Sequence, residues 1–104
     1  MHVLVLRPRF NRPVSDEEVQ QFAREAVPLY EQSGGFHALY NLRVSDREVV
    51  GISFWDSAED AERGFEAARP HMAALARGVL TGPPERTSGD VLFAYRVGEG
   101  KTPG

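Results

Sequence analysis

Residues 36–61 of the chain read FHALYNLRVSDREVVGISFWDSAEDA, and this stretch decides the fold. Apolar side chains recur at every second position over residues 36–44 and again over residues 49–55. A period of two is that of a β-strand, because successive side chains point to opposite faces of the sheet. Residues 45–47 between the two runs are short and polar, as in a hairpin turn. The stretch therefore predicts two antiparallel strands joined by a tight turn.

A strand and a helix are predicted upstream of the hairpin. Residues 3–6, VLVL, form an aliphatic run that stops before a proline, as a buried strand does. Ser15 and Glu18 have the spacing of a capping box and predict the start of a helix. Pro28 should kink this helix, and Gly34 with its neighbouring glycine should end it.

A second helix is predicted directly after the hairpin. Asp56 or Ser57 is expected to cap it, since both side chains accept hydrogen bonds from the free N–H groups of a first turn. Pro70 should break or restart the helix, with residues 71–77 as a further helical segment.

The last strand is expected at residues 91–97, where apolar residues alternate again. Residues 81–90 contain Gly, Pro and Ser and are predicted to be a loop. The resulting order is βαββαβ, which predicts an α+β, ferredoxin-like fold with one four-stranded antiparallel sheet. We expect a single domain over residues 1–97, followed by a flexible C-terminal tail at residues 98–104.

The strand pattern also predicts self-association. Two helices can cover only one face of a four-stranded sheet. Apolar residues occur on both faces of the predicted strands, with Tyr40 and Leu42 on one and Leu39 and Trp55 on the other. An uncovered apolar face is an association surface, so we expect a homodimer formed through it.

Composition excludes several classes of function. The chain has no cysteine, so it has neither disulfides nor thiolate chemistry. Its formal net charge of −3 argues against a partner that is nucleic acid or an anionic membrane. The predicted third strand lacks the stacking aromatics of RNA-recognition domains, and the apolar N-terminal run is too short to span a membrane or to form a signal peptide. A cytoplasmic protein is expected.

Two segments carry a resemblance to a known family. Residues 35–42, GFHALYNL, follow the first long helix, and residues 52–61, ISFWDSAEDA, lead into the second. Together they resemble the antibiotic-biosynthesis-monooxygenase-like family, in the dimeric α/β barrel superfamily, over residues 15–75 and the last strand. Residues 70–72, PHM, are similar to that family's His-then-large-apolar element. The resemblance implies a dimeric barrel of two packed sheets, and no cofactor in those members that are cofactor-free oxygenases.

Some positions depart from the family pattern. Arg7 stands where the haem-degrading members have an Asn, and their haem-ligating His falls near Ala74, so haem degradation is not expected. Gly64 replaces a residue that is often bulky in the family, and we expect this to leave extra room in the ligand cavity.

Candidate site residues follow from this resemblance and from the polar side chains on otherwise apolar strands. A cofactor-free oxygenase needs an apolar pocket, a base and polar groups that orient the substrate. His71 is our candidate base and Asn41 its catalytic companion. The residues expected to bind substrate are Trp55, Tyr95, His37 and Phe65. No metal site is expected, because the three histidines share no ligand spacing.

Each candidate also has a structural alternative. In the structural alternatives, His71 packs at a helix break, Asn41 forms a hydrogen bond at an interface, and Trp55 anchors the end of a strand. The leading functional hypothesis is a homodimeric, cofactor-independent monooxygenase-like protein that acts on or binds a small aromatic or polyketide-like molecule. The alternative is a non-catalytic, dimeric ligand-binding or stress-associated protein.

Overall fold

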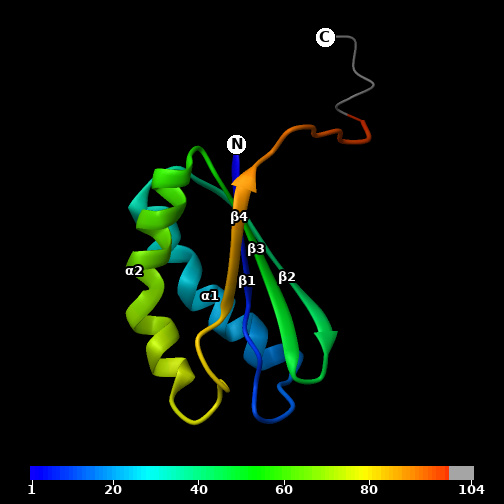
Figure 1. Ribbon diagram of the computed structural model, residues 1–104, viewed down its shortest axis with the longest axis vertical. Helices are drawn as coiled ribbons and strands as arrows, with labels where there is room; N and C mark the ends of the chain where they lie inside the picture. The colour runs from blue at the N-terminus through cyan, green and yellow to red at the C-terminus, as the bar shows by residue number, and fades with distance from the viewer. Residues whose placement is uncertain (99–104) are drawn as a thin grey trace.

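The computed structural model describes residues 1–98 of the chain, without the side chains of residues 75 and 76. Its elements follow the predicted βαββαβ order (Figure 1). They are β1 (His2–Arg7), α1 (Asp16–Ser33), β2 (Phe36–Ser45), β3 (Glu48–Trp55), α2 (Ala58–Ala76) and β4 (Glu85–Asp90). The predicted α+β, ferredoxin-like fold is confirmed. Residues 99–104, most of the expected tail, lie outside the described part.

All four strands form one antiparallel sheet in the order β2-β3-β1-β4. Both helices lie on the same side of this sheet, and α1 packs against α2 (Figure 1). The other face of the sheet is left uncovered by helices. Among the described residues, neither helix is long and apolar enough to cross a membrane.

Helix α1 begins and ends as predicted. Ser15 Oγ accepts a hydrogen bond from the Glu18 N–H, and the Glu18 carboxylate accepts one from the Ser15 N–H, which completes the capping box. Gly34 and Gly35 end the helix with φ values of 90° and 76°, in the region that favours glycine. Tight termination here allows β2 to start at once beside the helix.

Helix α2 departs from the prediction at Pro70. Ser57 caps it as expected, with its side chain accepting from the Asp60 N–H. The helix then runs unbroken to Ala76, so the predicted break at Pro70 is wrong. Pro70 is exposed, and water can satisfy the Glu66 carbonyl that loses its helical partner there.

The position of β4 is the main error in the predicted elements. Residues 81–90 were expected to form a loop, but Glu85–Asp90 pairs with β1 along its length, from Arg7↔Glu85 to His2↔Asp90. Residues 91–97 form no strand within this chain. The reason is that β4 is an edge strand whose residues are all exposed, so burial imposed no apolar alternation on it.

Trp55 is the centre of the main hydrophobic core. Its side chain is 0% exposed and packs with Leu4, Ala26 and Tyr30. Gly64 on α2 lies directly against the Trp55 ring, so that a Cβ at Gly64 would overlap the ring. The indole fills the space left by Gly64, and the prediction that this glycine enlarges the cavity is therefore wrong.

The uncovered face of the sheet is apolar, as the strand pattern predicted. The pairings Val5↔Ile52 and Tyr40↔Ile52 place these three side chains on that face. Tyr40 packs edge-on against Phe54 with ring centroids 6.0 Å apart, yet Tyr40 remains 60% exposed. Within residues 1–98, neither helix covers this face, and its side chains contact one another.

Candidate functional site

A cavity of about 100 Å³ lies between the sheet and the helices. Side chains of β1, β2 and β3 form one wall and side chains of α1 form the other, with Met72 of α2 and Val79 and Leu80 beyond it at one end. The lining is mostly apolar. The polar or charged residues in it are Arg12, Glu18, Tyr30, Asn41 and Ser53. We call this space the sheet–helix cavity.

Asn41, an exposed residue of the edge strand β2, is among the residues that line the sheet–helix cavity. It stands on β2 opposite Gly51 of β3, and a Cβ at Gly51 would lie 3.0 Å from Asn41 Oδ1. Glycine therefore leaves the room in which the amide lies across the neighbouring strand. Within the described residues, no hydrogen bond engages the Asn41 amide, so its donor and acceptor are available to a ligand.

Ser53 also lines the cavity, but its hydroxyl is already engaged. Trp55 Nε1 donates to Ser53 Oγ at 2.8 Å, and Ser53 Oγ lies 3.4 Å from the Leu4 carbonyl oxygen, to which it donates. Trp55 itself is not among the lining residues. The predicted substrate-binding role of Trp55 stays a prediction, and in this structure the indole contacts the cavity lining through its hydrogen bond to Ser53.

Tyr30 brings a phenol to the cavity from α1. Its ring packs against Phe36 and Trp55 at centroid distances of 5.4 and 5.2 Å. Burial raises the pKa of Tyr30, because desolvation disfavours the phenolate. The hydroxyl stays protonated near neutral pH and can donate a hydrogen bond.

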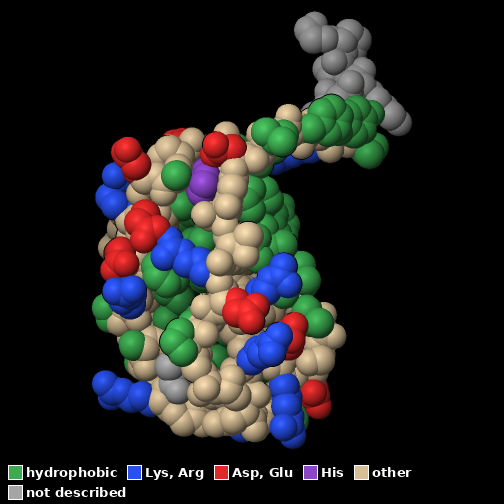
Figure 2. Space-filling view, viewed as in Figure 1, with side chains coloured by type: hydrophobic (Ala, Val, Ile, Leu, Met, Phe, Trp, Pro, Cys, Tyr) green, Lys and Arg blue, Asp and Glu red, His purple; other side chains and the backbone are tan. Residues whose placement is uncertain are grey.

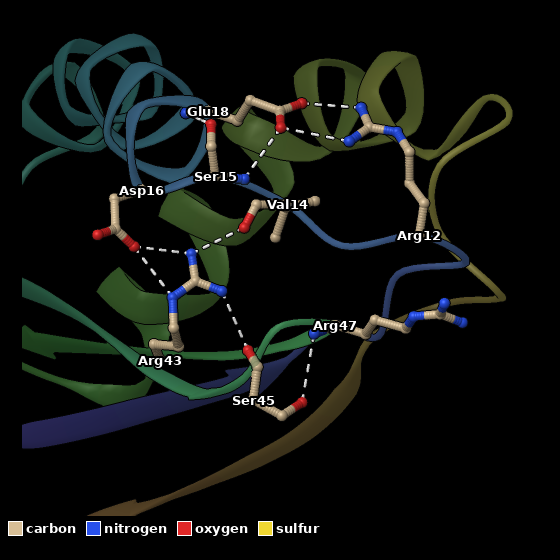
Figure 3. Close-up of polar contacts among 8 residues, drawn as sticks. All are labelled: Arg12, Val14, Ser15, Asp16, Glu18, Arg43, Ser45 and Arg47. Carbon is tan, nitrogen blue, oxygen red and sulfur yellow. Dashed lines mark hydrogen bonds and ion pairs between the residues drawn. The ribbon is translucent and has the colours of Figure 1, made fainter.

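An ion pair lies at the mouth of the cavity. Arg12 Nη2 is 2.8 Å from one oxygen of Glu18, and Arg12 Nη1 is 3.2 Å from the other (Figure 3). Both side chains line the cavity and are about half exposed, which places them where it opens to solvent. The Glu18 carboxylate also accepts a hydrogen bond from the Ser15 N–H, so it contacts both Arg12 at the mouth and the N-cap residue of α1.

Arg43 fixes the adjoining end of β2 to the start of α1. Its guanidinium donates to Asp16 Oδ1 at 2.8 and 3.0 Å, to the Val14 carbonyl at 2.8 Å and to the Ser45 carbonyl at 3.1 Å (Figure 3). In the same view the Arg47 guanidinium points away from this cluster. Arg43 therefore holds the start of α1 close to the end of β2.

The mouth ion pair predicts a pH dependence of stability. The hydrogen bonds from Arg12 and then from the Ser15 N–H lower the pKa of Glu18 from 4.5 to about 2. A carboxyl whose pKa is lower in the folded state stabilises that state above pH 4.5, and the stabilisation is lost as the pH falls toward 2. We expect urea unfolding of the Glu18→Gln variant to show a weaker loss of stability across that window than the parent chain. If the free energy of unfolding fell equally with pH in both chains, the lowered pKa would not belong to Glu18.

His71 lies outside the sheet–helix cavity. Its ring stacks on Phe22 with centroids 4.8 Å apart, and its Nε2 lies 3.4 Å from Glu25 Oε2. His71 and Glu25 line a separate groove between α1 and α2, which we call the helix groove. Phe22 lines both spaces, so its ring separates His71 from the cavity and from Asn41.

The other predicted binding residues are dispersed. His37 Nε2 lies 2.5 Å from Asp56 Oδ1 at the end of the sheet. Phe65 lies under Arg86, whose guanidinium carbon is 4.2 Å from the ring centroid. Tyr95 follows β4 and is 57% exposed. None of these three lines the sheet–helix cavity.

The cavity contains residues that the sequence analysis did not select. Tyr30 and Arg12 were not among the candidate site residues. Ser53 could have been selected from the sequence, because it is a polar residue on the buried face of an apolar strand. Within residues 1–98 no three His, Asp or Glu side chains converge as a metal site requires.

Comparison with solved structures places this geometry among known folds. A cofactor-independent oxygenase from Streptomyces nogalater, SnoaB, superimposes with a TM-score of 0.69 and 20% identity, covering 89% of this chain and 94% of the other. The monooxygenase ActVA-Orf6 of Streptomyces coelicolor, solved with nanaomycin D, gives 0.66 and 22%, covering 91% and 90%. The chain has the fold of the antibiotic biosynthesis monooxygenases.

Other comparisons show that this structural similarity does not by itself indicate an activity. A protein of unknown function from Nitrosomonas europaea is equally similar, with a TM-score of 0.70, 20% identity and coverage of 91% of this chain and 92% of the other. No protein-family model and no curated protein sequence matches the chain. The monooxygenase fold is therefore shared with a protein to which no activity is assigned, so the fold alone does not establish a reaction.

Proposed function

We propose that this protein binds a small aromatic, polyketide-like molecule in the sheet–helix cavity and promotes its oxidation by O₂ without a cofactor. The observation that carries the proposal is an apolar cavity into which Asn41 presents an unengaged amide. Apolar walls with a few placed polar groups are typical of small-molecule sites. The likeness to a cofactor-independent oxygenase supports the choice of reaction.

The chemistry suits a substrate that is itself easily oxidised. An anthrone-type molecule loses a proton from its central CH₂ group to solvent water and gives a phenolate-like anion, which donates electrons to O₂; the proton returns as the peroxide that forms breaks down. One oxygen atom becomes the new carbonyl and the other leaves as water, so the CH₂ becomes C=O. Asn41 would donate a hydrogen bond to the oxygen of that anion, and Tyr30 would donate a second. The apolar walls would exclude water from the reacting carbon.

The size of the cavity bears on how a ligand enters. An engineered cavity of about 150 Å³ holds one benzene molecule. The sheet–helix cavity, at about 100 Å³, is smaller than that, so a polycyclic ligand requires its walls to move. Arg12, Glu18 and Met72 are long, flexible side chains at its boundary, and changing their rotamers is the least costly way to enlarge it.

We infer further that the working protein is a homodimer built on the uncovered sheet face. Tyr40, Leu42 and Val44 of β2 are 60%, 46% and 55% exposed, and Ile52 and Phe54 of β3 lie beside them. A contiguous apolar surface of this kind in a small protein usually marks an interface. Packing two such faces together leaves each sheet–helix cavity on the outer side of its own sheet.

A second candidate function is a non-catalytic ligand-binding module. It is favoured by the lining of the cavity, in which no histidine occurs and the single carboxylate, Glu18, is held by Arg12 and Ser15. His71 can act as the base only if the Phe22 ring swings aside. The two functions therefore differ in whether substrate is consumed, and not in where it binds.

Oxygen uptake with anthrone tests the proposal. We expect the parent chain to accelerate uptake and the Asn41→Ala variant to lower the rate by roughly 10- to 150-fold, because a hydrogen bond to a charged group contributes about 1.5–3 kcal/mol. Gln32→Ala is a matched control, since Gln32 is an exposed amide outside the cavity lining. Uptake that is unaffected by Asn41→Ala would contradict the assigned site. Anthrone binding without uptake would favour the binding module, and His71→Ala then shows whether the imidazole contributes.

A further inference from the structure

Phe22 of α1 forms a wall that is one aromatic ring thick. Its side chain lines the sheet–helix cavity on one side and the helix groove on the other. On the groove side the Phe22 ring lies on the His71 imidazole, with the two ring planes 10° from parallel and the centroids 4.8 Å apart. Moving this one ring would therefore join the two spaces and uncover the face of the imidazole.

The Phe22 ring is not locked into the hydrophobic core. Among the described residues, Phe22 belongs to neither buried cluster, nor to the partly buried side chains that pack against those clusters. It is itself only partly buried. An aromatic side chain on a helix has two favourable χ1 angles, about 180° and about −60°. The ring can therefore leave its position by a single change of rotamer.

The surface beneath the Phe22 ring is the flat face of the His71 imidazole. His71 Nε2 is buried, has no hydrogen-bond partner among the described residues, and lies 3.4 Å from Glu25 Oε2. The nitrogen atoms lie in the plane of the imidazole, and the Phe22 ring is nearly parallel to that plane. Displacing Phe22 therefore uncovers a surface on which another ring can stack, and not a nitrogen atom that points at a substrate.

The helix groove by itself offers an aromatic molecule little to bind. Much of its lining consists of polar and charged side chains of α1, such as Gln21 and Arg24. On the face of α2 that Figure 2 shows, charged side chains of both signs also lie along the helix. An aromatic ligand would therefore reach the imidazole from the apolar cavity, past Phe22, and not from the groove alone.

The space that Phe22 occupies is what a polycyclic ligand lacks. The cavity of about 100 Å³ is smaller than the cavity of about 150 Å³ that holds one benzene molecule. The vacated position of a phenyl ring adds room for roughly one further ring. With Phe22 displaced, a flat polycyclic molecule can extend from the cavity onto the imidazole.

We propose that Phe22 is a displaceable gate and that a flat aromatic ligand takes its place on the His71 imidazole. Such a ligand exchanges one ring stack for another, so that opening the gate costs little. A saturated molecule of the same size has no ring with which to replace the lost stack, and the gate disfavours it. The inference rests on the ligand-binding function proposed above, and it makes Phe22 and His71 the residues that select flat aromatic molecules.

Nuclear Overhauser spectroscopy with anthrone tests the gate in the parent chain. The sample is kept free of O₂ so that the ligand is not consumed. The chain has three histidines, and the ring signals of His71 are assigned by their loss in the His71→Gln variant. We expect cross-peaks from anthrone to the His71 ring and also to the methyl groups of Ala26 and Val49, which line the cavity.

The other outcomes separate the gate from the proposed function. Cross-peaks to Ala26 and Val49 but not to His71 would overturn the gate and leave the cavity as the binding site. Cross-peaks to His71 alone would place the ligand in the helix groove and would also overturn the gate. If anthrone did not bind at all, both the gate and the proposed function would be wrong.

A double-mutant cycle of anthrone affinity gives a second measurement. Phe22→Ala should tighten binding by roughly two- to twelvefold, the contribution of one aromatic pair, because no stack has to be broken. Adding His71→Ala to Phe22→Ala should cancel that gain, whereas adding His71→Phe should preserve it. In the parent background His71→Ala should have a smaller effect, since the ligand there exchanges one stack for another.

Two results of this cycle would contradict the gate, once circular dichroism has shown that each variant is folded. Weaker binding by Phe22→Ala would identify Phe22 as a fixed wall of the cavity. A gain that persists in the chain with both Phe22→Ala and His71→Ala would come from the added volume alone, and the imidazole would not be the surface on which the ligand stacks.

Discussion

Replacing Trp55 by Ala should lower the free energy of unfolding by about 3–5 kcal/mol, the cost of removing a fully buried aromatic side chain. Trp55 is 0% exposed and contacts the rings of Tyr30 and Phe36 at 5.2 and 5.1 Å between centroids. A domain of this size has a total stability of about 5–15 kcal/mol, so the variant should retain only part of it. Urea unfolding followed by circular dichroism measures the change.

Trp55→Phe separates the two roles of this side chain. Phenylalanine keeps much of the apolar volume but removes the Nε1 donor from Ser53 Oγ. We expect Trp55→Phe to be less destabilising than Trp55→Ala, while the anthrone affinity of the folded variant still declines because Ser53 loses its partner. If Trp55→Ala and Trp55→Phe both unfolded with the free energy of the parent chain, Trp55 would not be the centre of the core.

The second large effect is expected for Gly64→Ala, which should lower the stability of the protein although Gly-to-Ala changes in helices usually raise it. Replacing a glycine inside a helix by Ala normally stabilises a protein by about 1 kcal/mol. At Gly64 the new Cβ would overlap the indole of Trp55, which has no free space to move into. We expect Gly64→Ala to destabilise by about 2–3 kcal/mol, as overpacked cores do.

A second substitution can show that this overlap is the cause. Combining Gly64→Ala with Trp55→Leu removes the part of the indole that the Cβ would meet. The double variant should lose less stability than the two single changes added together, because the two sites are in direct contact. Thermal unfolding of the four chains provides the comparison. Additive losses would mean that Gly64→Ala acts through some other contact.

The helices and three of the strands could be predicted because their signals are local. The capping box of Ser15 and Glu18 lies within one helical turn, and the period of two over residues 36–44 places the apolar side chains of β2 on one face of the sheet. β4 could not be predicted in this way. As an exposed edge strand it has no apolar pattern, whereas residues 91–97 after it have alternating apolar residues and form no strand within this chain.

The candidate site was predictable only in part. Asn41 was found because an amide on an apolar strand stands out, and the structure places it in the cavity. Which space His71 would face depended on helix α2 continuing through Pro70, and the unbroken helix turns the imidazole toward Phe22. Arg12 and Glu18 meet only after the loop before α1 has folded, so their pairing depends on tertiary structure.

The polar character of β4 has a consequence for how many copies can associate. An edge strand with free main-chain groups is a template on which further strands can add without limit. β4 exposes charged and hydroxyl side chains and offers no apolar flank, whereas β2 offers both a flank and a groove. The polar side chains of β4 therefore make this edge of the sheet a poor template for the addition of further strands.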